Sequence, residues 1–197
     1  VFSWAVLIFT SGVNIIFLFG LSIFALISLA YLIMYVPKFD YIQSRIFSFF
    51  NRDTGTHNFQ SDKAIESITS GGFFGKGIGE GTLKNRVPEA HTDYIISVIS
   101  EEFGVVAIIL ILLLFLIFIY MVFKKINFEK DDKIKLVLIG CVSLILMQAT
   151  IHIGVNIRLF PTTGMTLPFL SYGGSSIISI SIISGIILNL TKRKIEN

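Results

Sequence analysis

Charged residues and cysteine are both scarce in this sequence. Only 15% of its 197 residues are charged and 53% are hydrophobic, whereas about 25% of an ordinary soluble domain is charged. A soluble domain of this length cannot hide so much apolar surface in one core, which argues against a soluble enzyme or a disordered chain. The net charge of +3 provides no basic face of the kind that binds nucleic acid. Because Cys141 is the one cysteine, an internal disulfide and a cysteine-only metal site are excluded.

Long apolar runs make the membrane the expected solvent, because about 20 apolar residues of helix cross a bilayer. The sequence predicts spans over Val13–Val36, Phe103–Phe123 and Leu136–Val155, and a shorter one over Ile177–Leu190 that extends back towards Tyr172. The third span has polar interruptions at Gln148 and His152, and residues 2–11 resemble the remnant of a fifth span. We therefore expect an all-α, polytopic helical bundle. Residues 1–197 would form a single membrane domain, the C-terminal part of a larger protein.

The placement of lysine and arginine predicts the orientation, since cytoplasmic loops are enriched in both. Five lysines fall within Lys124–Lys135, and three basic residues lie in the tail Thr191–Asn197. Two spans separate these segments, so both can be cytoplasmic. The loop 37–93 and the loop 156–172 would then be extracytoplasmic. The protein is expected in the bacterial cytoplasmic (inner) membrane.

The long outer loop contains predicted structure of its own. Phe39–Phe50 is rich in aromatic residues and is interpreted either as an interfacial segment on the membrane or as a short packed helix. Ser61 and Asp62 are suited to cap a helix that runs to about Thr69.

Six glycines lie between residues 71 and 81 of this loop. They free the backbone for close approach to a ligand, and the amides, with Lys76, Lys84 and Arg86, can cradle an anion. A flexible, tightly turning loop explains the same glycines. The run does not match a nucleotide-binding motif, because Ser70 and Gly77 stand at positions that a Walker A motif gives to glycine and Ser/Thr.

The segment Pro88–Asp93 (PEAHTD) precedes the second predicted span. Thr92 is suited to cap that helix, or Asp93 to occupy its first turn. The position of Asp93, where a glycine-rich loop enters the membrane, also makes it a candidate functional carboxylate. His91 and Asp93 alone are too few ligands for a metal site.

Further polar residues follow along the same helix. Ser97, Ser100 and Glu101 lie near the face of Asp93, whereas Glu102 points roughly the opposite way. Ionisable groups at that depth tend to line protein cavities. The alternative is that Glu101 and Glu102 form an interfacial pair in a water-filled vestibule.

Residues 156–176 contain two prolines and three glycines, which predicts a broken helix. Irregular backbone at membrane depth requires cover by protein or a water-filled cavity. Ser171, Ser175 and Ser176 can satisfy freed backbone groups, or they can belong to a re-entrant element that lines the cavity of Asp93. Arg158 can pair with a phosphate or with a loop carboxylate.

The stretches GKGIGEGTLK, PEAHTDYIISVISEEFG and FPTTGMTLPFLSYGGSS resemble the SEDS family (shape, elongation, division and sporulation), to which FtsW, RodA and SpoVE belong. The resemblance covers nearly the whole chain. It implies a peptidoglycan glycosyltransferase that polymerises lipid II, a disaccharide-pentapeptide on undecaprenyl pyrophosphate, together with a class B penicillin-binding transpeptidase. The essential acidic residue of the family maps onto Asp93, a carboxylate suited to general base catalysis.

The resemblance also implies a substrate site around Asp93. The leaving pyrophosphate needs positive charge from basic side chains or from a divalent cation such as Mg²⁺ or Mn²⁺. The resulting candidate substrate-binding residues are Lys76, Lys84, Arg86, Glu89, His91, Glu101, Arg158, Ser171, Ser175 and Ser176.

Motif details favour the cell division branch over the elongation branch, although Thr163 stands where the division branch usually has lysine. Two other functions remain open. One is a lipid II flippase, which the broken helix would suit. The other is a non-catalytic scaffold for the transpeptidase, in which Asp93 would be dispensable.

Overall fold

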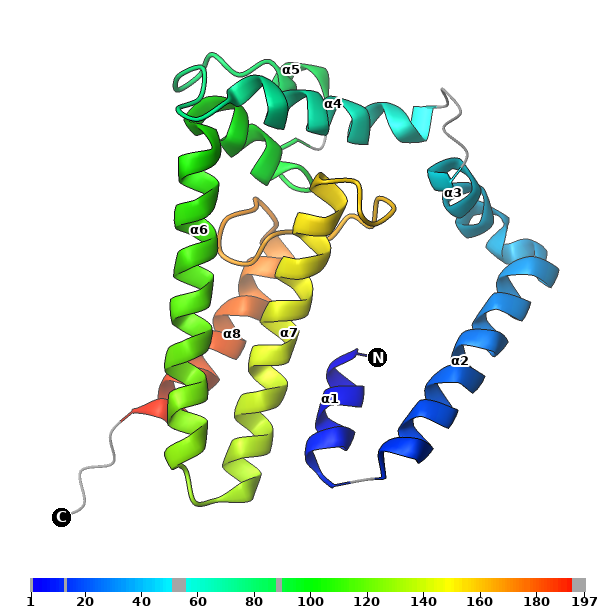
Figure 1. Cartoon of the computed structure of the whole chain (residues 1–197), viewed down its shortest axis with the longest axis vertical. Helices are drawn as coiled ribbons and strands as arrows, with labels where there is room; N and C mark the ends of the chain where they lie inside the picture. The colour runs from blue at the N-terminus through cyan, green and yellow to red at the C-terminus, as the bar shows by residue number, and fades with distance from the viewer. Residues whose placement is uncertain (1, 13, 51–55, 88–89, 193–197) are drawn as a thin grey trace.

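The computed structural model describes residues 2–12, 14–50, 56–87 and 90–192. In these ranges every regular element is a helix, which confirms the all-α prediction (Figure 1). In chain order the helices are α1 (Phe2–Thr10), α2 (Ile15–Tyr35), the 3-10 helix η1 (Pro37–Phe39), α3 (Asp40–Phe50), α4 (Thr56–Gly71), α5 (Leu83–Arg86), α6 (Ile95–Phe128), α7 (Asp132–Asn156) and α8 (Gly174–Thr191).

Four of these helices, α2, α6, α7 and α8, are long and apolar enough to cross a membrane, so the protein is a multi-pass membrane protein. They correspond to the predicted spans, and α1 corresponds to the predicted remnant. The largest difference is at α6, which has 34 residues where the sequence predicted a span over Phe103–Phe123. Helix α6 is interrupted at Gly104, and its part over residues 105–128 alone, about 36 Å at 1.5 Å per residue, can cross a hydrocarbon core of about 30 Å. The turns of α6 before Gly104 are therefore not needed to cross the membrane.

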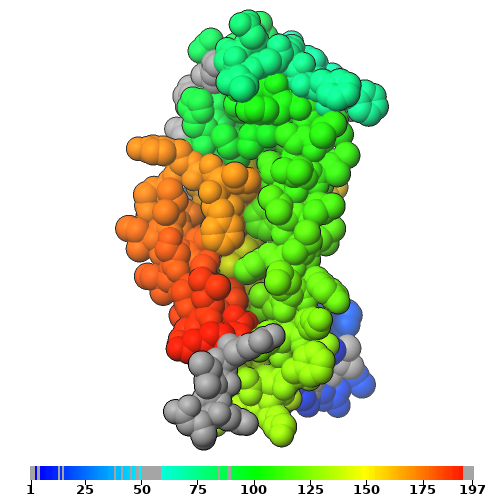
Figure 2. Space-filling view, turned by 90° about the vertical axis from the view of Figure 1, so that its left-hand side faces the viewer, coloured from blue at the N-terminus to red at the C-terminus, as the bar shows by residue number. Residues whose placement is uncertain are grey.

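Helices α6, α7 and α8 pack together and form the framework of the site. Figure 2 shows α6 beside α8, with the segment that follows α7 above α8. Their shared core lies in the half of the bundle away from α4 and consists of Val122, Ile126, Leu138, Val142, Ile145, Ile180 and Ile187. Burial of these branched side chains stabilises the bundle and gives α7 a firm position.

Helix α2 stands apart from this bundle (Figure 1). Within the described chain it packs on α1, η1 and α3, and none of the residues in its most apolar window is buried. Helix α1 packs against α7. The surface of α2 is therefore left for lipid or for further protein.

The loop between α2 and α6 forms a layer over one end of the bundle, where α4 lies across α6 (Figure 1). The predicted helix start at Ser61 and Asp62 is wrong, because α4 begins at Thr56. Ser61 is instead a buried residue on the inner face of α4, along with Ala64 and Ser67. Packing of this face against α6 outweighs the capping preference of Ser61 and Asp62. Phe39–Phe50 is helical from Asp40 onward, and its placement on the membrane stays a prediction.

Candidate active site

His91, Thr92 and Asp93 form a turn immediately before α6. The expectation that Thr92 caps the helix or that Asp93 lies in its first turn is wrong. The N-cap is Tyr94, which makes no side-chain capping hydrogen bond, and the helix begins at Ile95. We call residues 91–93 the HTD turn.

The HTD turn is held through its main-chain carbonyl groups. Three donors from the end of α7 and from the segment 157–173 reach it, which explains why the turn is not free to join α6. Ser171 Oγ donates to Thr92 O over 2.8 Å, Tyr172 N to His91 O over 3.2 Å, and Asn156 Nδ2 to Asp93 O over 3.0 Å.

The Asp93 carboxylate faces the segment that connects α7 to α8. Asp93 is half-buried, and a β-carbon added at Gly164 would lie 3.7 Å from Asp93 Oδ2. Gly164 has φ +68°, a conformation that side chains rarely adopt. Gly164 of the segment 157–173 therefore lies close to the Asp93 carboxylate, and the shared cavity stays a prediction.

Three polar residues lie on one face of α7, and none of them was predicted as a site residue from the sequence. Gln148 and His152 hold this segment, whereas Asn156 binds the HTD turn. Gln148, His152 and Asn156 are spaced four residues apart, so they share a helix face. Gln148 Nε2 donates to Thr166 O (2.9 Å), Thr166 Oγ1 (3.0 Å) and Ser176 Oγ (3.1 Å). His152 Nδ1 lies 2.7 Å from Met165 O. Since a carbonyl only accepts, Nδ1 carries the proton.

Helix α6 is broken at Gly104, which has φ +78° and ψ −176°. The glycine-rich loop takes over the hydrogen bonds that the break leaves open. Lys76 N and Gly77 N donate to the carbonyls of Glu101 and Glu102 over 2.8 and 3.1 Å. In return, Val105 N donates to Gly72 O over 3.0 Å. The close approach that the glycines permit is thus to the backbone of α6.

Glu101 is a buried anchor for the same loop rather than a vestibule residue. Its side chain is 1% exposed and accepts three hydrogen bonds: from Lys76 Nζ (2.8 Å), Thr82 Oγ1 (3.1 Å) and Leu83 N (3.0 Å). A buried carboxylate needs such partners because burial of an unpaired charge is costly. Lys76, a predicted substrate residue, is therefore already paired.

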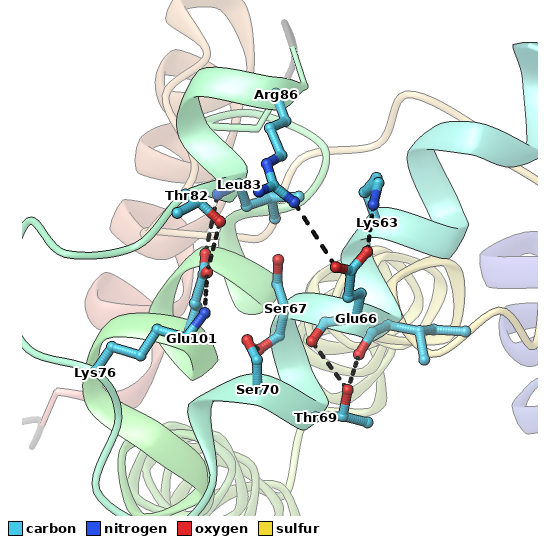
Figure 3. A network of polar contacts seen from close by, with 11 residues as sticks. Lys63, Glu66, Ser67, Thr69, Ser70, Lys76, Thr82, Leu83, Arg86 and Glu101 are labelled. Carbon is cyan, nitrogen blue, oxygen red and sulfur yellow. Dashed lines mark hydrogen bonds and ion pairs between the residues drawn. The ribbon is translucent and has the colours of Figure 1, made fainter.

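A polar pocket of about 160 Å³ lies beside this anchor (Figure 3). It contains three basic side chains and two carboxylates, and it is lined by Lys63, Glu66, Ser67, Ser70, Lys76, Thr82, Leu83, Arg86 and Glu101. Arg86 Nη1 lies 3.7 Å from Glu66 Oε1, and Lys63 pairs with the same carboxylate. The hydrogen bond and charge of Lys63 hold the pKa of Glu66 below its ordinary value. Glu66 is therefore ionised at neutral pH, and the pocket keeps a small surplus of positive charge.

The remaining predicted residues are spread around the site. Arg158 pairs with Asp62 of α4, the loop carboxylate that was one of its two expected partners. His91 is exposed. Glu89 and the side chain of Lys84 lie outside the described residues.

The three serines differ in what they contact. Ser171 satisfies backbone groups, since its Oγ also accepts from Leu167 N over 2.7 Å. Ser176 Oγ lies 2.6 Å from Thr166 Oγ1, and Ser175 is exposed. The structure thus brings Ser171 to the HTD turn and holds Ser176 at the polar face of α7.

An apolar groove of about 310 Å³ opens between α6 and the turn that precedes Ser171. Its lining is almost wholly hydrocarbon and consists of Ile111, Leu114, Phe115, Phe118, Pro168, Phe169 and Leu170. Such a groove suits an alkyl or polyprenyl chain.

The described residues contain no group of three or more His, Cys, Asp or Glu side chains arranged to hold a metal ion. His91 and Asp93 alone do not make such a set. The divalent cation stays a prediction.

Comparison with known proteins places this geometry in a family. The FtsW/RodA/SpoVE family of cell cycle proteins matches residues 1–196. The chain is 34% identical over 187 residues to the probable peptidoglycan glycosyltransferase FtsW of Enterococcus hirae, covering 90% of this chain and 47% of the relative. It is 38% identical over 161 residues to the protein of the same name from Caulobacter vibrioides, covering 79% and 40%.

A sporulation protein and a solved structure are similar as well. Stage V sporulation protein E of Bacillus subtilis is 35% identical over 190 residues, covering 95% of this chain and 51% of that protein. A chain from a peptidoglycan synthase complex that coordinates polymerization and crosslinking has the same fold, with a TM-score of 0.77 and 24% identity over 96% of this chain and 53% of that one. The chain spans about half the length of these proteins. It belongs to the FtsW/RodA/SpoVE family of cell cycle proteins.

Proposed function

We propose that this chain carries the catalytic carboxylate of a peptidoglycan glycosyltransferase that polymerises lipid II during cell division. The observation that carries the proposal is the half-buried Asp93, whose main-chain carbonyl accepts from Asn156 of α7 and whose carboxylate lies near Gly164 of the segment 157–173. The names of the relatives from Enterococcus hirae and Caulobacter vibrioides support the reaction class.

Asp93 acts as the general base. The hydroxyl oxygen of the acceptor sugar attacks the anomeric carbon of the donor lipid II, and the hydroxyl proton passes to the Asp93 carboxylate. The bond from the anomeric carbon to the pyrophosphate oxygen breaks, and undecaprenyl pyrophosphate leaves with the electron pair. A carboxylate that is partly shielded and held by its backbone is suited to this role, because proton transfer depends on fixed geometry.

The leaving pyrophosphate requires positive charge close by. Arg158 is one candidate among the described basic residues, because it lies two residues after Asn156, which bonds to the Asp93 backbone. Its present partner is Asp62. Lys76 and Arg86 line the polar pocket, where Lys76 has a structural partner in Glu101. The apolar groove beside Phe169 offers a surface for the polyprenyl chain.

The orientation follows from the basic segments. The loop 37–93 and the HTD turn face the outside of the cytoplasmic membrane, where lipid II is polymerised, and the C-terminus faces the cytoplasm. A class B penicillin-binding transpeptidase is the expected partner. The similarity to a chain of a complex that coordinates polymerization and crosslinking is compatible with such a partner.

The test is polymerisation of purified lipid II by the full-length protein with its transpeptidase. We expect wild type to form glycan strands and Asp93→Asn to lose at least about 10²-fold in rate, since general base catalysis contributes about 10²–10⁴-fold. Asp131→Asn is the matched control. Asp131 caps α7 at the opposite end of the bundle, and asparagine caps a helix about as well as aspartate.

The outcomes separate the competing functions. Full activity of Asp93→Asn would remove Asp93 from the chemistry. Absence of polymer from wild type, under conditions where a known polymerase works, would favour the flippase or the scaffold.

A further inference from the structure

Asn156 occupies the point where the HTD turn, α6 and α7 meet. The residue is fully buried, and its side-chain amide makes four hydrogen bonds. The oxygen Oδ1 accepts from Ser97 N over 3.2 Å and from Ser97 Oγ over 2.7 Å. The nitrogen Nδ2 donates to Asp93 O over 3.0 Å and to His152 O over 2.8 Å.

We propose that Asn156 is the positioning residue for the Asp93 carboxylate, an inference that rests on the proposed role of Asp93. It binds the carbonyl of Asp93 itself and, through Ser97, the first turns of the helix that follows. These contacts fix the backbone on both sides of Tyr94. The direction of the Cα–Cβ bond of Asp93, and with it the position of the carboxylate opposite Gly164, follows from that backbone.

The amide group is required because the site has two donors and two acceptors at once. Asparagine offers an acceptor oxygen with two lone pairs and a nitrogen with two protons, which matches the four bonds. An aspartate of the same shape would place an oxygen against the carbonyls of Asp93 and His152 and would repel both. Alanine would leave the Asp93 carbonyl and the Ser97 donors without this partner in a buried place.

A role in positioning differs from a role in general stability. The turn before α6 has no side-chain cap on Tyr94, so the amide of Asn156 supplies an anchor that the local sequence lacks. The first half of α7, away from the HTD turn, contributes stability in another way, through buried apolar residues such as Leu138. A variant there weakens the bundle without contact to the HTD turn, which provides a matched comparison.

The experiment measures kcat and KM for lipid II polymerisation by the full-length protein with its transpeptidase. The variants are Asn156→Ala, Asn156→Asp, Ser97→Ala, Asp93→Asn and Leu138→Ala, each examined for thermal unfolding in the same detergent. We expect kcat of Asn156→Ala and Asn156→Asp to fall about 10²-fold, the loss that a misplacement of about 1 Å produces. KM stays within about threefold, because substrate binding in the ground state is not removed.

Ser97→Ala and Leu138→Ala complete the series. Ser97→Ala removes one of the four bonds and is expected to lower kcat by less, about 3–10-fold, which keeps the test open if Asn156→Ala does not fold. Leu138→Ala is expected to lower the unfolding temperature as much as Asn156→Ala while its folded fraction keeps the wild-type kcat.

Three outcomes would overturn the inference. If folded Asn156→Asp and Ser97→Ala retain the wild-type kcat while Asp93→Asn is inactive, only the positioning role fails. If Leu138→Ala loses kcat in the same proportion to stability as Asn156→Ala, the role of Asn156 is structural. If wild type is inactive or Asp93→Asn is fully active, the proposed function fails as well.

Discussion

Lys76 and Glu101 join the glycine-rich loop to α6. Lys76 Nζ donates to Glu101 Oε1 over 2.8 Å, and the Glu101 side chain is 1% exposed whereas that of Lys76 is 36% exposed. The backbone of Lys76 also donates to the Glu101 carbonyl over 2.8 Å. One residue of the loop therefore contacts both the side chain and the main chain of the same helical residue, directly before the break at Gly104.

Lys76→Met is expected to destabilise the protein because it leaves Glu101 with a buried charge and no cation. Removal of one partner of a buried pair costs about 3–5 kcal/mol, and the partial exposure of Lys76 reduces this to about 1–3 kcal/mol. Thermal unfolding of the detergent-solubilised protein measures the loss. The double variant Lys76→Met, Glu101→Gln should lose less than the sum of the two single variants. Strictly additive losses would show that the pair contributes nothing.

The same variants test whether Lys76 serves the substrate. If its role is the anchor alone, folded Lys76→Met polymerises lipid II at a rate close to wild type. A loss of about tenfold or more at unchanged folded fraction would assign Lys76 to the pyrophosphate instead.

The membrane architecture could be predicted because the spans are long, mainly apolar runs, and such runs are visible without any tertiary contact. The HTD turn was recognised through its motif. Ser97 and Ser171 were placed near it from the sequence, but Asn156 was not, because its bonds to Ser97 and Asp93 join residues 59 and 63 positions apart. The spacing of Gln148, His152 and Asn156 along one face of a span was the available signal.

The sequence left the role of the glycine run open for a physical reason. Glycines permit close approach of any group, and their pattern does not say whether the group is a ligand or another stretch of backbone. The glycine-rich loop docks where α6 breaks at Gly104. Gly104 lies at the start of an apolar run, and the sequence gives little sign that the helix breaks there.

Gly104→Ala is expected to detach the glycine-rich loop from α6. A β-carbon at this position would lie 2.2 Å from Phe73 O, and the φ of +78° is itself unfavourable for alanine. We expect a loss of about 3 kcal/mol or more, together with faster proteolysis of the loop 72–82. Gly185→Ala is the matched control, since it lies in α8 with nothing within 4 Å of the added carbon. That variant should be about 0.5–1 kcal/mol more stable than wild type. Equal behaviour of the two variants would contradict the docking of the loop at Gly104.

Gln148→Leu is expected to loosen the segment 157–173. Its Nε2 donates to Thr166 O, Thr166 Oγ1 and Ser176 Oγ. The two hydroxyls also bond to each other over 2.6 Å, whereas the part-buried Thr166 carbonyl would lose this donor, at a cost of about 1 kcal/mol. Amide hydrogen exchange should become faster over residues 164–172 and remain unchanged over the first half of α7. Thr150→Ala, at an exposed position of the same helix, should leave exchange as in wild type. Unchanged exchange in Gln148→Leu would show that other contacts hold the segment.

Arg158 and Asp62 allow the anchoring and substrate roles of a basic residue to be separated. Arg158 pairs with Asp62 of α4, and its φ of +57° places it in a conformation that costs a residue other than glycine about 1–3 kcal/mol. Such strain is retained where the surrounding structure requires the residue in one place.

If Arg158 serves the leaving pyrophosphate, Arg158→Gln lowers the polymerisation rate at least about tenfold. Asp62→Asn leaves the arginine available and the rate near wild type. We expect this asymmetry. Equal and small effects of the two variants would mean that the pair only ties the segment 157–173 to α4. In that case a charge exchange, Arg158→Asp with Asp62→Arg, should restore the unfolding temperature.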